Sequence, residues 1–330
     1  MTMKTFLQQK FLRWTELTLI AILLFVHLSL ADSGGLSHIP GAFVDVGLGA
    51  RPMGLAGAAA VLTRDADAIL YNPAGLTSLT GPQARFSMTR QFSLIPYDML
   101  LYGQKGPAAT AFGVGFLTTG DEALRENTVL LSVAHSLPWR LSGGFTLKYR
   151  SCSFGNNADG IWNWQGGNRQ VHGSGRGYGI DLGLRTVIGK RLAIAAVWKD
   201  AFGKVNYDAS NGIGSAEGGS EAVPPGLILG LGFFPARNFS VEVNLKKSLY
   251  ADTANRLMFG GEKTLFSFLT VRGGYAQDLD ASTKNRLYSV GGGLFHRFSS
   301  LPFDFSFDFA YLFHELQNFS HLSFGIAWRK

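Results

Sequence analysis

The sequence contains one cysteine, Cys152, among its 330 residues. A single cysteine cannot form an internal disulfide and cannot by itself build a structural zinc site. Past the N-terminal 31 residues, no stretch approaches the roughly 18 continuous apolar residues of a transmembrane helix. The mean hydropathy is only +0.11. A bundle of membrane-spanning helices is therefore excluded.

Long basic clusters are also lacking, although Lys and Arg together number 30 and Asp and Glu 23, a net charge of +7. Nucleic-acid-binding chains usually gather their positive charge in patches or recognisable motifs. We therefore expect no nucleic-acid partner. A weakly cationic surface instead suits contact with anionic headgroups of membrane lipid.

The motifs of catalysis and cofactor binding are incomplete. A dinucleotide fingerprint would start at Gly47, but its third glycine position is occupied by Pro52. A helical zinc motif would start at His314, but the next histidine, His321, is too distant for one helical face. We expect no enzymatic activity, no cofactor and no metal.

The N-terminus has the layout of a secretory signal peptide. Three basic residues, Lys4, Lys10 and Arg13, precede an apolar segment from Leu17 to about Leu30, and the small residue Ala31 follows. An uncleaved anchor helix is the alternative, but this segment is shorter than the roughly 20 residues that span a bilayer. We predict a signal peptide over residues 1–31.

Residues 303–313 place an aromatic ring at every second position, in Phe-Asp-Phe-Ser-Phe-Asp-Phe-Ala-Tyr-Leu-Phe. Strict alternation is typical of a β-strand with one apolar face. A face this rich in aromatic rings would aggregate in water, so lipid is its natural environment. We expect Phe305, Phe307 and Phe309 to contact lipid and Asp308 to face the opposite side.

The same alternation recurs along the chain past residue 82. It predicts an all-β fold, a transmembrane antiparallel β-barrel of about 14 strands over residues 83–330. The predicted strands are 83–94, 97–105, 108–118, 126–137, 140–154, 176–188, 190–199, 226–234, 237–247, 256–264, 265–277, 285–298, 302–313 and 319–328.

The lengths of the connections alternate as well. Connections after even-numbered strands are short, whereas the longest, at about 155–175 and 200–225, follow odd-numbered strands. Alternation of this kind is typical of a barrel with short periplasmic turns and long outer loops. We predict that Pro107, Pro138 and Pro235 mark periplasmic turns.

Residues 32–82 lack alternation and are rich in Gly and Ala, which predicts a plug (hatch) for the wide lumen of such a barrel. Within this segment the chain reads Gly-Ala-Arg-x-Met-Gly-x-x-Gly-Ala from Gly49, then Asp65-x-x-Ala, then Asn-Pro-Ala-Gly-Leu from Asn72. This order resembles the N-terminal signature of the FadL-like outer-membrane barrels, most closely their PorV/PorQ branch. The last residues depart from the family, because Trp328 is followed by Arg329 and Lys330 instead of ending the chain.

The resemblance implies two functions. The first is an outer-membrane channel for small hydrophobic solutes, fatty-acid-like or aromatic, that pass without covalent chemistry and leave through the wall or past a displaced plug. The alternative is an accessory barrel of protein secretion or surface attachment with a closed lumen. The expected partners are membrane lipid, a hydrophobic small molecule or secretion-system proteins, and the outer-membrane assembly machinery.

Three groups of candidate residues follow. The plug group is a fold signature or a gate: Gly54, Gly57, Asn72, Pro73, Ala74 and Gly75, with Gly75 expected to allow a positive φ. The lumen group consists of charged residues that pair with one another or touch a solute: Lys148, Arg150, Asp181 and Arg185. The outer-loop group would capture hydrophobic solutes or fold the loop on itself: Trp162 and Trp164.

Overall fold

The alternating segments form fifteen strands in the computed structural model, which describes Phe43 and residues 47–92, 94–155, 172–210, 217–250, 253–279 and 285–329. The predicted signal peptide and both tryptophans, Trp162 and Trp164, lie outside these residues. The strands are β1 Gln83–Gln91, β2 Ile95–Lys105, β3 Thr110–Gly120, β4 Leu124–Ser136, β5 Leu141–Phe154, β6 His172–Ile188, β7 Leu192–Ser210, β8 Glu217–Ala222, β9 Gly226–Ala236, β10 Phe239–Ser248, β11 Arg256–Phe266, β12 Leu269–Asp278, β13 Arg286–Arg297, β14 Phe303–His314 and β15 Phe319–Trp328.

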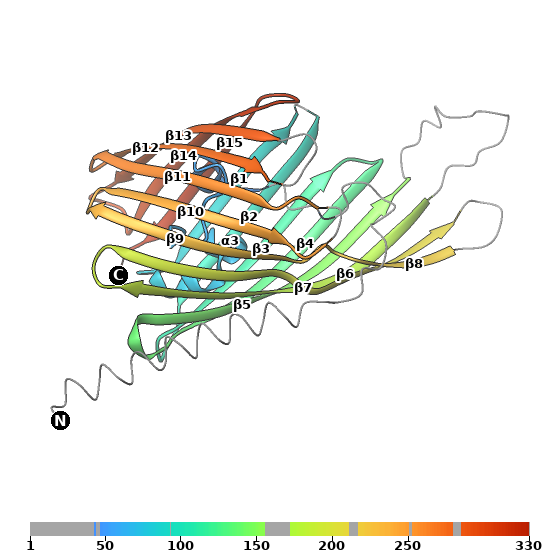
Figure 1. Cartoon of the computed structure of the whole chain (residues 1–330), viewed down its shortest axis with the longest axis horizontal. Helices are drawn as coiled ribbons and strands as arrows, with labels where there is room; N and C mark the ends of the chain where they lie inside the picture. The colour runs from blue at the N-terminus through green and yellow to red at the C-terminus, as the bar shows by residue number, and fades with distance from the viewer. Residues whose placement is uncertain are drawn as a thin grey trace. The chain divides into compact units, whose positions relative to one another are not determined.

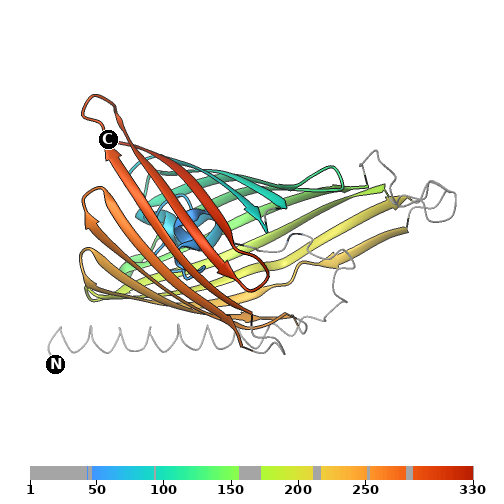
Figure 2. The same ribbon diagram turned by 90° about the horizontal axis from the view of Figure 1, so that it is seen from above.

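Fourteen of these strands close into a barrel (Figures 1 and 2). Each pairs antiparallel with its neighbour in the chain, β1 pairs with β15, and β7 pairs with both β6 and β9. The predicted barrel and its strand number are confirmed. One predicted boundary is displaced, because the turn between β11 and β12 lies at Ser267–Phe268 and not at Thr264–Leu265.

The strand β8 was not predicted. The connection expected over 200–225 is instead largely strand, since β7 continues to Ser210 and β8 pairs back onto it from Lys204–Ala222 to Ala209–Glu217. The register between β6 and β7 shifts twice, and each shift adds one residue to β7. Two such bulges interrupt the alternation at residue 200 and explain why the continuation of β7 was not predicted. Figure 1 shows β6, β7 and β8 projecting beyond the other strands at the end of the long connections.

The two faces of the wall follow the parity of the sequence. On β14, Phe305 and Phe309 are 36% and 39% exposed, whereas Asp308 is 3% exposed. Exposed aromatic and aliphatic side chains alternate with inward ones on the neighbouring strands too. The predicted orientation of β14 is confirmed, and the exposed apolar face is the one suited to lipid.

The plug lies inside the barrel (Figure 2). It contains the short helices α2 Ala50–Met53 and α3 Ala68–Tyr71 and the 3₁₀-helix η1 Pro73–Ser78, and a second 3₁₀-helix, η2 Pro138–Arg140, forms the turn between β4 and β5. None of the helices in the described residues is long and apolar enough to cross a membrane.

Glycines in the wall make room for the plug. A Cβ at Gly183 would lie 2.2 Å from Oδ1 of Asn72, and one at Gly144 would lie 2.8 Å from the carbonyl carbon of Pro73. On the other side, a Cβ at Gly274 would lie 2.3 Å from the carbonyl carbon of Leu55. Gly144 and Gly274 therefore permit contact between the wall and the plug backbone, and Gly183 accommodates the side chains of Asn72 and Pro73.

Substituting Gly183 by alanine is expected to loosen the plug. The new methyl group cannot fit beside Asn72, so the corner of the plug must shift, at a cost of about 1–3 kcal/mol. Thermal unfolding of the purified protein should occur at lower temperature. Gly273→Ala is the matched control, because its nearest neighbour atom would lie at an ordinary 3.9 Å; equal loss in both variants would contradict this packing.

Candidate functional site

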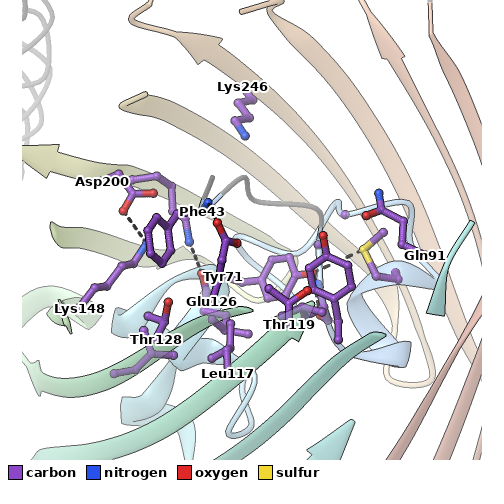
Figure 3. Close-up of a pocket in the computed structure, with 18 of the residues that line it drawn as sticks. Phe43, Tyr71, Gln91, Leu117, Thr119, Glu126, Thr128, Lys148, Asp200 and Lys246 are labelled. Atoms are coloured by element: carbon purple, nitrogen blue, oxygen red, sulfur yellow. Dashed lines mark hydrogen bonds and ion pairs between the residues drawn. The ribbon is translucent and has the colours of Figure 1, made fainter. Parts of the chain in front are cut away.

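A cavity of about 360 Å³ lies between the plug and the long-connection ends of the strands (Figure 3). The plug contributes Leu48, Met53 and Tyr71, and the wall contributes apolar side chains such as Leu117 and Met258. The site is therefore a mostly apolar chamber with a closed floor, as expected for a binding site of a small molecule.

One wall of the cavity carries a buried network of ion pairs. Lys148 lies 2.8 Å from Oδ1 of Asp181 and 2.9 Å from Oδ1 of Asp200, and Lys199 lies 3.0 Å from Oδ2 of Asp181. Arg150 also pairs with Asp200. Buried charges of this kind are tolerated because each is paired.

The structure thus brings together three of the four predicted lumen residues, Lys148, Arg150 and Asp181. The fourth, Arg185, lies elsewhere and donates from Nε to the carbonyl oxygen of Val61 in the plug at 3.1 Å. Sequence reasoning missed Lys199 and Asp200. Asp200 has a φ of 52° and sits in the bulged part of β7, where strand parity gives no guide to the direction of a side chain.

Phe43 reaches the same wall. Its backbone N–H donates to Oε1 of Glu126 at 2.9 Å, and the guanidinium of Arg150 lies 5.6 Å from the centre of its ring. Figure 3 shows the ring beside Lys148 and Asp200. This part of the N-terminal segment therefore lines the cavity.

The plug is bonded to strands on several sides of the barrel. Glu242 on β10 accepts hydrogen bonds from the N–H groups of Val61 and Leu62, both at 2.7 Å. The N–H of Ala50 donates to Oγ of Ser323 on β15 at 2.7 Å. These contacts satisfy plug backbone groups that would otherwise be buried without partners.

Seven charged residues form a further cluster between the plug and the wall. Their closest pairs lie between 2.7 and 3.3 Å. The members are Arg51, Asp65 and Asp67 of the plug, Arg85 of β1, Glu262 of β11, Arg272 of β12 and Asp308 of β14. Removing Arg85 would leave the buried Asp67 carboxylate without its ion-pair partner, so the cluster holds the plug against this side of the barrel.

The Asn72–Gly75 corner is held by hydrogen bonds of the Asn72 side chain. Asn72 is extended, with φ −159° and ψ 104°, and its side chain donates to the carbonyl oxygen of Ala60 at 2.8 Å and accepts from the N–H of Ala74 at 3.1 Å. Pro73 then begins η1. The corner joins plug to wall, because Asn72 also donates to the carbonyl oxygen of Leu184 at 3.2 Å.

The three predicted plug glycines have different roles. Gly75 was expected to take a positive φ, but it lies within the right-handed η1, and the prediction is wrong. It is needed because a Cβ there would lie 2.4 Å from the carbonyl oxygen of Thr63. Gly57 does have a positive φ, 82°, and Gly54 packs with its Cα 3.1 Å from the position of a Cβ at Gly291.

Two buried carboxyls of the plug, Asp65 and Asp67, have pKa values shifted in opposite directions. Both lose solvent, but the charges of Arg85 and Arg51 outweigh this for Asp65 and lower its pKa to about 2. For Asp67, burial prevails and raises the pKa to about 7 from an ordinary value of 3.8. Because the pKa of Asp67 is raised on folding, this carboxyl makes the folded state less stable as the pH rises from 3.8 to about 7.

Replacing Asp67 by asparagine is expected to remove this pH dependence. Relative to the parent chain, the variant should gain thermal stability at about pH 8, where Asp67 is ionised, and little at about pH 4. Calorimetry of both proteins at the two pH values measures the difference. A gain that is larger at the lower pH would show that the Asp67 carboxylate is favourably solvated by Arg85 when ionised.

No cluster of three or more His, Cys, Asp or Glu side chains suited to a metal occurs among the described residues. Cys152 is a buried free thiol on β5. The cavity combines apolar side chains with charged walls.

No protein-family model and no curated protein sequence matches this chain. Solved structures do match. A CymD monoaromatic hydrocarbon channel superposes with a TM-score of 0.60 at 16% identity, covering 86% of this chain and 98% of the channel. The toluene transporter TodX of P. putida gives 0.57 at 14% identity, covering 86% and 99%. A FadL homologue of Pseudomonas aeruginosa gives 0.58 at 12% identity, covering 86% and 98%. At these identities the chain is similar to FadL-like channels in fold, with nearly the whole of each neighbour covered.

Proposed function

We propose that this protein is a FadL-like outer-membrane channel that passes small hydrophobic solutes without covalent chemistry. The mostly apolar cavity above the plug is the observation that carries this proposal. The fold supports it, because solved structures that superpose on this chain include proteins described as a monoaromatic hydrocarbon channel and a toluene transporter. Outward apolar side chains such as Leu131 and Phe309 would contact lipid. Like other barrels, the chain would depend on the outer-membrane assembly machinery.

The secretion or surface-attachment role of the PorV/PorQ branch gains no support from these neighbours. A docking surface would lie on the long outer connections at about 155–175 and 200–225. These connections include residues outside the described part of the chain, among them Trp162 and Trp164. We retain capture of hydrophobic solutes as the proposed role of these two tryptophans, because indole rings bind apolar molecules well.

The solute would leave through the wall and not past the plug. The plug is bonded to strands around the lumen, among them β6, β10 and β15, so its displacement would break many buried contacts at once. The seam between β6 and β7, beside the cavity, is irregular. Its register shifts twice, and Asp200 and Phe202 take positive φ values of 52° and 58°, which are unfavourable for residues other than glycine.

Filling the cavity tests the proposed channel. We expect Leu117→Trp to reduce toluene uptake by outer-membrane vesicles several-fold, because Leu117 lines the cavity. Phe116→Trp is the matched control, since Phe116 is the next residue and is 44% exposed on the lipid-facing side. Equal uptake by both variants and the parent chain would contradict solute passage through this cavity.

Engineered disulfides test the route by which the solute leaves the cavity. In a Cys152→Ser background, a disulfide between Tyr178→Cys and Lys204→Cys would join a cross-strand pair of the bulged seam. A second disulfide, between Ala50→Cys and Ser323→Cys, would fix the plug to β15. We expect the first to slow uptake and the second to leave it unchanged. The reverse result would favour passage past a moving plug.

A further inference from the structure

Lys246 lies on the lumen face of β10 and faces the cavity from the side opposite the ion-pair network (Figure 3). Its side-chain ammonium forms no hydrogen bond and no ion pair with the residues that the structure describes. Its cross-strand neighbour is another cation, Arg256. The acidic group nearest to Arg256, Oδ1 of Asp278, is 3.8 Å away, longer than a hydrogen bond.

The two charged walls of the cavity therefore differ. Lys148 and Lys199 each lie within 3.0 Å of a carboxylate oxygen and have their charge compensated. Within the part of the chain that the structure describes, Lys246 and Arg256 form a pair of like charges whose compensation is incomplete. A cation beside an apolar cavity attracts an anion more strongly than one in bulk water, because the surroundings screen the charge less.

The rest of the cavity limits what that anion can be. Tyr71, Tyr97 and Phe319 contribute rings, which suits a planar apolar body. On the far wall, Lys148, Arg150 and Lys199 are each already paired with a carboxylate, so that wall offers no unpaired cation to a second negative charge. These features favour a molecule with one acidic group at one end and a ring at the other.

We propose that the cavity binds a monoanionic aromatic acid, with its carboxylate on the Lys246 ammonium and the Arg256 guanidinium. The inference rests on the proposed channel function and specifies its substrate class. The neighbours CymD and TodX are described as acting on monoaromatic hydrocarbons and toluene, which carry no charge. Lys246 is thus the residue that sets the preference for a charged solute in this chain.

Benzoate and toluene form a matched pair of probes, because they differ only in the carboxylate. Binding of each to the full chain, purified in detergent at neutral pH, can be measured by equilibrium dialysis with labelled solute. We expect benzoate to bind more tightly than toluene. Lys246→Met should weaken benzoate binding by about tenfold or more, as expected for a lost charge-assisted hydrogen bond, and leave toluene binding unchanged.

Two further variants control for other effects. Lys246→Arg keeps the charge and should retain benzoate binding, whereas Lys247→Met removes a charge from the next residue, which is exposed on the other face, and should change neither solute. Hexanoate has the same charge without a ring and should bind less tightly than benzoate.

Several outcomes would overturn the proposal. Unchanged benzoate binding by Lys246→Met would contradict the role of the lysine. Tighter binding of hexanoate than of benzoate would contradict the preference for an aromatic ring. If either occurred while Leu117→Trp still blocked toluene uptake, the channel function would stand and this inference alone would fall. If neither benzoate nor toluene bound to the protein or was taken up, the channel function and this inference would both be contradicted.

Discussion

Deleting residues 47–80 should convert the closed barrel into an open pore. These residues form the plug inside the lumen, and the wall remains closed by its own strand pairing from β1 to β15. The stability of a transmembrane barrel rests mainly on this complete pairing and on lipid contact. In the deleted protein, water would enter the lumen and solvate Glu242 and Lys199, so the loss of their plug partners need not prevent assembly.

Planar-bilayer recordings would measure the effect. The deleted chain should show a much higher ion conductance than the full mature chain. Lys246→Met changes the cavity but keeps the plug, so its conductance should stay low. Equal conductance of deleted and full chains would mean that the plug does not obstruct the pore, and the closed floor of the cavity would have to be reconsidered.

An arginine at Phe309 should destabilise the barrel strongly. Phe309 lies near the middle of β14 and is 39% exposed on the outward face. A cationic side chain there would be held near the bilayer midplane, at a cost of about 2–4 kcal/mol. The free energy of unfolding from lipid vesicles, measured by denaturant titration, should fall by this amount.

Phe313→Arg provides the control on the same strand. Phe313 has a similar exposure, 44%, but lies next to the end of β14, where an arginine can reach the headgroups and costs only about 0–1 kcal/mol. If both variants lost the same free energy of unfolding, the position of the membrane along β14 would differ from that proposed.

The barrel could be predicted from the sequence because each strand carries its own signal. Alternation in a segment such as Phe239–Leu245 depends only on which face is wet and which is apolar, and this requires no knowledge of partners. The signal failed where β7 gains two extra residues around Asp200, since a bulge breaks local periodicity although Val205 and Tyr207 resume inward positions beyond it. β8, with the sequence Glu-Gly-Gly-Ser-Glu-Ala, has no apolar face to detect.

The site was less predictable because it depends on contacts between distant segments. Strand parity correctly placed Lys148, Arg150 and Asp181 inside the barrel. It could not show that Arg185 would serve the plug, nor that Gly183 is needed to accommodate Asn72. Such requirements arise only once the plug and the wall meet, and no local pattern encodes them.

The pairing of β1 with β15 also constrains how the chain folds. The first and last strands of the wall must meet, and the hydrogen bond from Ala50 to Ser323 spans 273 positions of the sequence. Contacts this remote in sequence form slowly, because much of the chain must be ordered before they stabilise it. Until then both strands present unpaired edges that can join other chains. A protein truncated before β15 would retain those edges permanently, so its expected fate is aggregation instead of a smaller barrel.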